Sequence, residues 1–197
     1  MSSLLQRGHL YVISAPSGTG KTTVVHRLRQ LSPALTHSIS YTTRAPRTGE
    51  RDGHDYFFVD AATFQRMIDQ HEFIEWARVY DQSYGTPKQQ IEDCRARGAD
   101  IMLDIDVQGA FAVKQFDPSA TLIFLVPPSM EVLEQRLRKR GTESAEAIAR
   151  RLRQAQYELA QQHRYDAVFV NHVVDETCAQ ILALIHNRRT DNAGTPR

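Results

Sequence analysis

Short runs of apolar residues alternate along the chain with segments in which apolar residues recur at helical spacing. The continuous apolar runs are typical of strands buried on both faces of a sheet, and they cover residues 9–15, 100–106, 121–127 and 167–171. The segments with helical spacing cover residues 21–31, 107–116, 129–140, 144–163 and 175–189. This alternation predicts an α/β fold, in which helices lie on both sides of a mainly parallel sheet.

The first predicted helix, residues 21–31, places four apolar residues on one face: Val24, Val25, Leu28 and Leu31.

Two regions depart from the alternation of strands and helices. Residues 36–91 combine two-residue alternation with turn signals, which predicts a small mixed or mostly antiparallel lobe with a loop between residues 59 and 73. Residues 136–153 hold seven Arg or Lys and two acidic residues, which is typical of a basic flap.

We therefore expect a single domain over residues 1–197. Its predicted parts are a core (8–35, 92–128 and 156–189), a lobe (36–91), a helical lid (129–155) and a frayed polar tail (190–197).

The composition narrows the class of protein. The formal net charge is +1, so neither a nucleic-acid binder nor a membrane-surface protein is indicated. The two cysteines stand apart and no Cys/His cluster is present, which argues against a zinc site or a disulfide framework. No apolar run is long enough for a membrane span and the first residues lack a signal-peptide pattern, so we expect a cytoplasmic protein.

The strongest local motif is the stretch SAPSGTGKTT, residues 14–23, which follows a predicted strand and opens a predicted helix. Gly18 and Gly20 allow the backbone N–H groups to turn toward phosphates, and Lys21 can reach the terminal phosphates. The Thr22 hydroxyl can bind Mg²⁺. Ala15 stands where the usual pattern has glycine, and a small residue suffices there. A glycine-rich turn that binds nothing is the alternative, which the strand–loop–helix context disfavours.

We expect this phosphate loop to hold a nucleoside triphosphate through Ser14, Ala15, Pro16, Ser17, Gly18, Thr19, Gly20, Lys21, Thr22 and Thr23.

Residues 40–56 are dense in groups that suit a phosphate monoester. Arg44 and Arg47 can offer two guanidinium forks, and Ser40 and Tyr56 can add hydroxyl donors. From composition alone, a solvated loop with outward charges is the favoured alternative.

Acidic residues follow the predicted strand 100–103 at its carboxyl end, which is where ligands bind in parallel sheets. Asp104 could hold a water bound to Mg²⁺. Asp106 suits that role and the capping of the next helix equally well. Glu75, taken alone, is most simply an exposed carboxylate on a strand.

Several long motifs resemble the guanylate kinase family in order and spacing, from about residue 9 to residue 187. They are A-P-S-G-T-G-K, S-Y-T-T-R-A-P-R-T-G-E, F-I-E-W-A, Y-G-T, L-D-I-D-V-Q-G and R-x-x-x-R-G-T-E. The resemblance implies a P-loop NTPase fold and a Mg²⁺-dependent transfer of the γ-phosphoryl group of ATP to GMP, and to dGMP, giving ADP and GDP. It also accounts for Ala15, a familiar variant in that family.

The resemblance implies roles for individual residues. The phosphate of GMP is expected on Ser40, Arg44, Arg47, Tyr56 and Tyr84. Guanine is expected on Glu75, Thr86 and Asp104, with Asp106 beside them. The lid is expected to close on the ATP phosphates with Arg136, Arg140 and Arg151, and Asn171 is expected near adenine. Lys21, Arg44 and the three lid arginines are the expected catalytic residues.

The chemistry needs no general base, because a phosphomonoester is already largely dianionic at neutral pH. The alternatives are a related ribose-bisphosphate kinase and a guanylate-kinase-like module that binds phosphopeptides. Glu75 with Thr86 argues against the first, and the intact Gly18, Lys21 and Thr22 argue against the second. Expected partners are ATP and GMP, with neither nucleic acid nor a membrane involved, and a homo-oligomer stays open.

Overall fold

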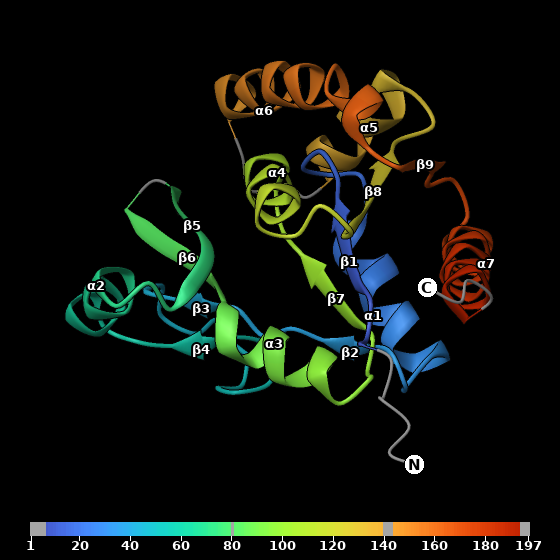
Figure 1. The fold of residues 1–197 in the computed structure, drawn as a ribbon. Coiled ribbons are helices and arrows are strands. Elements are labelled where there is room, and N and C mark those ends of the chain that lie inside the picture. The colour runs from blue at the N-terminus through green and yellow to red at the C-terminus, as the bar shows by residue number, and fades with distance from the viewer. Residues whose placement is uncertain (1–6, 80, 140–143, 194–197) are drawn as a thin grey trace, which may run out of the picture. The chain divides into compact units, whose positions relative to one another are not determined.

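The computed structural model describes residues 7–79, 81–139 and 144–193 (Figure 1). These residues form two compact units. The first takes its described residues from Met1–Leu10, Ala34–Leu103 and Gln108–Ala120. The second takes them from Tyr11–Pro33, Asp104–Val107 and Thr121–Arg197. The predicted Arg140 lies outside the described residues.

Parallel strands form the centre of the second unit. β8 (Thr121–Val126) pairs with β1 (Leu10–Ser14) on one side and with β9 (Ala167–Val170) on the other. β1 is buried along its whole length, and β8 is buried except at Val126, which explains their continuous apolar sequences. The predicted strands are therefore confirmed, with ends shifted by one or two residues.

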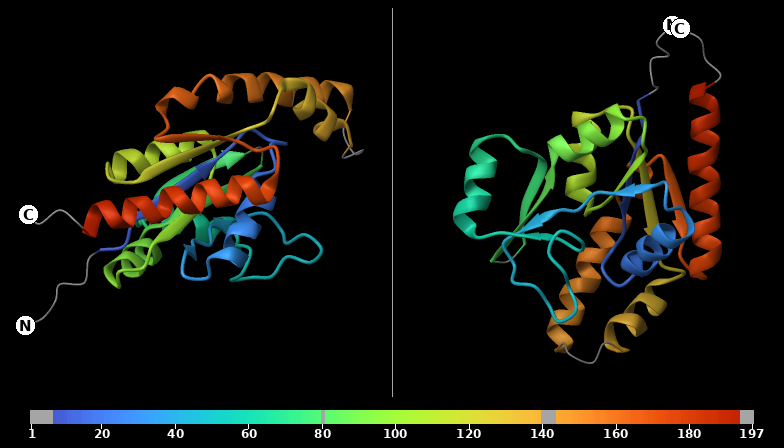
Figure 2. Two further views of the ribbon diagram at one scale, coloured as in Figure 1. Left: turned by 90° about the vertical axis from the view of Figure 1, so that its right-hand side faces the viewer. Right: turned by 90° about the horizontal axis from the view of Figure 1, so that it is seen from below.

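Two helices of this unit pack against each other (Figure 2). They are α1 (Lys21–Leu31) and α7 (Val174–Ala193). α1 has the predicted bounds and buries Val24, Val25 and Leu28. Leu31, expected on the same face, is instead 45% exposed, because it is the last residue of the helix. α7 continues through residue 193, beyond the predicted change to a frayed tail at residue 190.

The described parts of the basic segment, residues 136–139 and 145–153, are helical. α5 (Met130–Lys139) and α6 (Ala145–Leu159) share an apolar cluster of Leu133, Leu137, Ile148 and Ala155. The Ser144 side chain accepts the N–H of Ala147 and so begins α6. A 3₁₀ turn, η1 (Gln162–Arg164), follows.

The first unit contains a second group of parallel strands with two helices. β2 (Thr36–His37) pairs in parallel with β7 (Ile101–Asp104), whose last residue belongs to the second unit. The helices are α3 (Lys88–Ala96) and α4 (Val107–Phe116). Residues 36 and 37, expected at the start of the lobe, thus pair with a strand of the predicted core.

The same unit carries a four-stranded sheet in the order β4-β3-β6-β5 (Figure 1). Its strands are β3 (Tyr41–Thr42), β4 (Phe57–Phe58), β5 (Phe73–Val79) and β6 (Gln82–Pro87). β3 and β4 are parallel, whereas β6 is antiparallel to β3 and to β5. The sheet is therefore mixed.

A helix occupies the predicted loop between residues 59 and 73. α2 (Ala61–Asp69) begins where the Asp60 side chain accepts the N–H of Thr63, 2.6 Å away. It buries Phe64 and Met67 against Phe73 of β5. The loop prediction was wrong because two apolar residues three apart are a weak periodic signal in so short a helix.

No helix within the described ranges combines the length and apolar character needed to cross a membrane.

Candidate active site

The phosphate loop links β1 to α1 through two left-handed glycines. Gly18 has φ +93° and Gly20 has φ +99°, values that L side chains adopt only with strain. The turn is closed by a hydrogen bond from the Thr19 N–H to the Pro16 carbonyl, 3.1 Å long. Because α1 starts at Lys21, its N–H groups and its positive dipole end face this loop.

Ala15 tolerates its methyl group for a local reason. Among the described residues, the only non-glycine residue with positive φ is His71, so Ala15 needs no glycine conformation. In the loop, Ser14, Pro16 and Thr19 are buried, Gly18 and Gly20 are half-buried, and Ser17 is exposed. Thr22 and Thr23 are exposed at the start of α1. The phosphate loop thus leads into a helix whose first turn carries two exposed hydroxyl groups, those of Thr22 and Thr23.

Lys21 is held at the carboxyl end of β7. Its ammonium forms an ion pair with the Asp104 carboxylate and donates to the Ile105 carbonyl at 3.1 Å. Both side chains of the ion pair are 23% exposed, so an entering ligand can reach them. A strongly positive group beside a helix N-terminus is suited to bind phosphate oxygens.

Asp106 lies on the same acidic segment and is exposed. Its backbone carbonyl accepts the Ser14 hydroxyl at 3.2 Å, which joins the start of the phosphate loop to this segment. Burial raises the pKa of the Tyr165 phenol to about 12, and the nearby Ser14 hydroxyl acts in the opposite direction. Ser14 therefore fixes the start of the phosphate loop to the segment that follows β7.

A further carboxylate near Lys21 comes from α6. Burial raises the pKa of Glu158, and the Asp106 charge raises it further. A hydrogen bond from Gln154, 2.9 Å long, and the charge of Lys21 act in the opposite direction. Lys21 is therefore in electrostatic reach of a carboxylate that was not among the predicted residues.

The signal for Glu158 was present in the periodicity of its helix. Ile148 and Ala155 belong to the apolar cluster that α5 and α6 share. Glu158 follows Ala155 by three residues, so it lies on the same face of α6, where it is half-buried. A glutamate at an inward position of an amphipathic helix costs free energy unless it serves electrostatics or binding.

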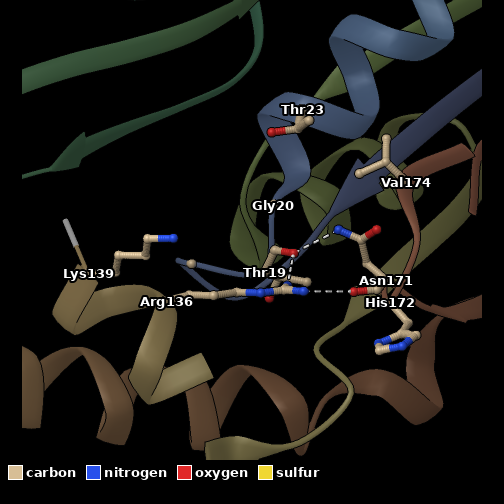
Figure 3. A pocket seen from close by; sticks show the side chains of 9 residues that line it. Thr19, Gly20, Thr23, Arg136, Lys139, Asn171, His172 and Val174 are labelled. Carbon is tan, nitrogen blue, oxygen red and sulfur yellow. Dashed lines mark hydrogen bonds between the residues drawn. The ribbon is translucent and has the colours of Figure 1, made fainter. Parts of the chain in front are cut away.

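A cavity of about 350 Å³ opens beside the phosphate loop (Figure 3). It is lined by Gly18, Thr19, Gly20, Thr23, Arg136, Lys139, Asn171, His172 and Val174. Its size and mixed lining suit part of a nucleotide. Two residues expected at ATP thus lie at this cavity, Arg136 for its phosphates and Asn171 for adenine. Arg151, also expected at the phosphates, is half-buried on α6.

In the first unit, Arg44 lies among aromatic rings and a carboxylate. Its guanidinium pairs with Glu50 at 2.9 Å and stands 5.5 Å from the centre of the Tyr56 ring. The Tyr56 and Tyr84 rings meet edge to face at 6.0 Å. Three residues expected at the acceptor phosphate are thus brought together.

The other two lie close by in the chain. Arg47 is exposed, and its backbone N–H donates to the Glu50 carboxylate at 2.7 Å. The Ser40 carbonyl accepts the N–H of Phe57, beside Tyr56, at 2.9 Å. Glu50 was not among the predicted residues. Its hydrogen bond to Arg44 and the backbone bond from Arg47 lower its pKa against the effect of burial, so it remains ionised as a counter-ion.

Glu75 and Thr86 face each other across β5 and β6. The ladder aligns them as direct partners, and the Thr86 hydroxyl donates to the Glu75 carboxylate. Ala77 and Tyr84 are the next pair on the same face, because side chains alternate along a strand. Thr86 is fully buried while Glu75 is half-buried, so the threonine fixes a carboxylate that a ligand can still reach.

The chain is similar to proteins of a known family. A family model described as guanylate kinase matches residues 7–188. The chain is 47% identical over 180 residues to the guanylate kinase of Nitrosomonas europaea, covering 91% of this chain and 90% of that protein. It is 51% identical over 171 residues to the guanylate kinase of Myxococcus xanthus, covering 86% and 82%.

A solved structure is also similar. The crystal structure of guanylate kinase from Anaplasma phagocytophilum aligns with a TM-score of 0.77 and 36% identity, covering 94% of this chain and 88% of that one. The likeness therefore extends over nearly the whole chain in both sequence and structure.

Proposed function

Because the chain belongs to the guanylate kinase family, we propose that its two units divide the substrates of one reaction, the transfer of the γ-phosphoryl group of ATP to GMP. The products are ADP and GDP. The observation that carries the proposal is the Glu75 carboxylate held by the Thr86 hydroxyl on the β5–β6 pair.

This carboxylate matches guanine. Guanine presents its N1–H and 2-amino group side by side, and one carboxylate can accept both. Adenine has a lone pair at N1 in place of the N–H, so the Glu75 carboxylate would face another acceptor. A buried acceptor without a donor costs roughly 1–3 kcal/mol, and more when it is charged. Since Thr86 fixes Glu75, little conformational freedom is lost on binding. The proposed contacts involve base and phosphate, so dGMP is an acceptor as well.

The acceptor phosphate is held by Arg44, Arg47, Ser40, Tyr56 and Tyr84. Arg44 is already ordered by its ion pair with Glu50 and by the Tyr56 ring. A guanidinium has five donors, so Arg44 can keep this carboxylate and still offer N–H groups to a phosphate.

The donor phosphates bind the phosphate loop and Lys21 in the second unit. Arg136, Arg151 and Arg140 supply further positive charge. In-line transfer between two polyanions depends on positioning and charge neutralisation, and the nucleophile is a phosphate oxygen that needs no base. Exclusion of water prevents simple hydrolysis of ATP.

Mg²⁺ fits the oxygen groups beside Lys21. The Thr22 hydroxyl is exposed at the start of α1, and the Asp104 carboxylate ends β7. Within the described residues no group of three or more His, Cys, Asp or Glu side chains could hold a metal. This suits Mg²⁺, which prefers oxygen ligands and binds through few carboxylates together with substrate phosphates. When bound, the ion neutralises charge on the transferred group.

The proposed setting is the cytoplasm, with ATP and GMP as partners. The net charge of +1 supports an enzyme that acts independently of nucleic acid and membranes. A homo-oligomer is compatible with the proposal, and light scattering of the purified chain would measure the assembly state.

The experiment is an ADP-release assay with ATP and a panel of acceptors, namely GMP, dGMP, AMP, UMP and ribose 1,5-bisphosphate. GMP and dGMP should be phosphorylated far faster than the others. Glu75→Gln should lower kcat/KM for GMP about 10- to 100-fold, as expected for a lost charged hydrogen-bond acceptor. Exposed Glu72→Gln, just before β5, is the matched control and should leave the rate unchanged.

Equal rates with GMP and AMP would contradict the role of Glu75. Preference for ribose 1,5-bisphosphate would favour the related kinase. Absence of ADP formation together with phosphopeptide binding would favour an interaction module.

A further inference from the structure

The Thr19 carbonyl, in the middle of the phosphate loop, is held by two side chains (Figure 3). Arg136 Nη1 of α5 donates to it at 2.9 Å, and Asn171 Nδ2, just after β9, donates at 2.8 Å. These partners are 117 and 152 residues away in the chain. We call this arrangement the carbonyl clamp.

The clamp determines where the next N–H points. The Thr19–Gly20 peptide is planar and trans, so its C=O and N–H project in opposite directions. A carbonyl held toward Arg136 and Asn171 turns the Gly20 N–H toward the opposite side, which we take as the side of the donor phosphates. In the reverse orientation an oxygen would face the phosphates in place of that donor.

The loop alone does not select this orientation. A peptide flip changes φ of the following residue, and Gly20 populates positive and negative φ about equally well. The observed φ of +99° at Gly20 is one of two accessible states. The side chains that hold the carbonyl therefore decide which state is occupied.

Asn171 is itself locked in the donating orientation. The Thr19 carbonyl can only accept, so it selects Nδ2 as the atom of Asn171 that faces it. The Thr177 hydroxyl lies 3.2 Å from Asn171 Oδ1 and 3.0 Å from the Val173 carbonyl, and it shares its one proton between these two acceptors. The Asn171 backbone N–H donates to the Val126 carbonyl at 2.8 Å. Asn171 and Thr177 are 3% and 1% exposed, so water competes poorly for these bonds.

Arg136 completes the clamp. Its second nitrogen, Nη2, donates to the Asn171 carbonyl at 3.4 Å, so one guanidinium spans two backbone carbonyls. The clamp thus joins α5, the phosphate loop and the end of β9.

We propose that Asn171 and Arg136 are positioning residues that hold the Thr19–Gly20 peptide so that its N–H faces the donor phosphates. The inference rests on the proposed function, since it assumes that the loop binds the triphosphate of ATP. It gives Asn171 a role in phosphate binding that does not require contact with the base.

The clamp has a measurable consequence. Without it the peptide populates both orientations, and the apparent affinity for a triphosphate falls by the fraction that remains competent. Loss of one buried hydrogen bond corresponds to about a tenfold change.

The test uses Asn171→Leu, which removes the donor without adding charge, and inorganic tripolyphosphate as a probe that has no base. Binding of ATP and of tripolyphosphate, measured by calorimetry with Mg²⁺, should weaken by the same factor, about tenfold. GMP affinity should not change, because Glu75, Thr86 and the residues proposed for the acceptor phosphate lie in the first unit.

Weaker ATP binding with unchanged tripolyphosphate binding would show that Asn171 contacts the base, and it would overturn the proposal. Unchanged binding of both probes would overturn it too. If Asn171→Leu loses its cooperative thermal unfolding, Thr177→Val carries the test. That variant keeps Asn171 but frees its amide to rotate, and both probes should weaken about threefold.

A failure of the proposed function would be distinct. Wild-type protein would then form no ADP with GMP, whatever the variants bind.

Discussion

Two carboxylates act on Lys21, those of Asp104 and Glu158. Asp104 pairs with the lysine directly, whereas Glu158 acts on it from α6 through its charge. An ATP phosphate that approaches Lys21 meets one positive group and two negative ones. Mg²⁺ at Asp104 would offset part of that charge, but Glu158 is left as a source of repulsion.

Glu158→Gln should therefore lower the KM for ATP. A repulsion of about 1 kcal/mol, ordinary for partly buried charges at an effective dielectric constant near 20, corresponds to about a fivefold change. The measurement is initial-rate kinetics with varied ATP at saturating GMP. Glu146→Gln, at an exposed position of the same helix, is the control and should leave KM unchanged. A raised KM in Glu158→Gln would mean that the carboxylate helps to hold the donor.

The helix α3 contacts the rest of the first unit through a buried arginine, Arg95. Arg95 is 4% exposed, donates to the Gly8 carbonyl at 2.9 Å and pairs with Asp117, which follows α4. Burial tends to raise the pKa of Asp117, but hydrogen bonds from Ser119 and the charge of Arg95 outweigh it, so this pKa is lowered overall. The ion pair thus links two helices of the first unit.

The lowered pKa makes the stability of this unit depend on pH. A carboxyl group with a folded-state pKa below its unfolded value of 3.8 stabilises the fold above that pH. This contribution is lost as the pH falls from 3.8 through the folded-state pKa. In urea unfolding, wild type should be more stable than Asp117→Asn at pH 6, and the difference should shrink below about pH 4.

The control for this experiment is Asp69→Asn, an exposed aspartate at the end of α2. Its unfolding free energy should track that of wild type at each pH. A difference between Asp117→Asn and wild type that stays constant with pH would refute the linkage.

At the level of the whole chain, the proposed donor and acceptor groups belong to different compact units. Lys21 and the phosphate loop lie in the second unit, whereas Arg44, Glu75 and Thr86 lie in the first. Each unit holds its groups through internal contacts, such as Lys21 with Asp104 and Thr86 with Glu75. Damage to one site should therefore leave binding at the other intact.

Lys21→Ala tests this separation. It should lower kcat at least about 100-fold, because the principal positive charge at the donor phosphates is lost. GMP affinity, measured by calorimetry without ATP, should equal that of wild type. Arg29→Ala removes one positive charge from the same helix and should keep full activity. A kcat near wild type in Lys21→Ala would contradict the phosphate-loop assignment.

The amino-acid pattern alone was enough for the parts of the molecule that local physics controls. The bounds of α1, the buried strands β1 and β8, and the glycines of the phosphate loop follow from periodicity and backbone sterics. The family resemblance added the residues expected at the substrates. Local signals were too weak for α2, whose start depends on a single cap at Asp60.

Only the tertiary structure decided which side chains act together. Asn171 and Arg136 meet the Thr19 carbonyl across 152 and 117 residues of chain, and no periodicity encodes such a pairing. The roles of Glu158 and Glu50 likewise depend on their neighbours in the fold, which are Lys21 and Arg44. The physical reason is that apolar spacing reports which face of an element is buried, whereas hydrogen bonds and charges depend on what the fold brings to that face.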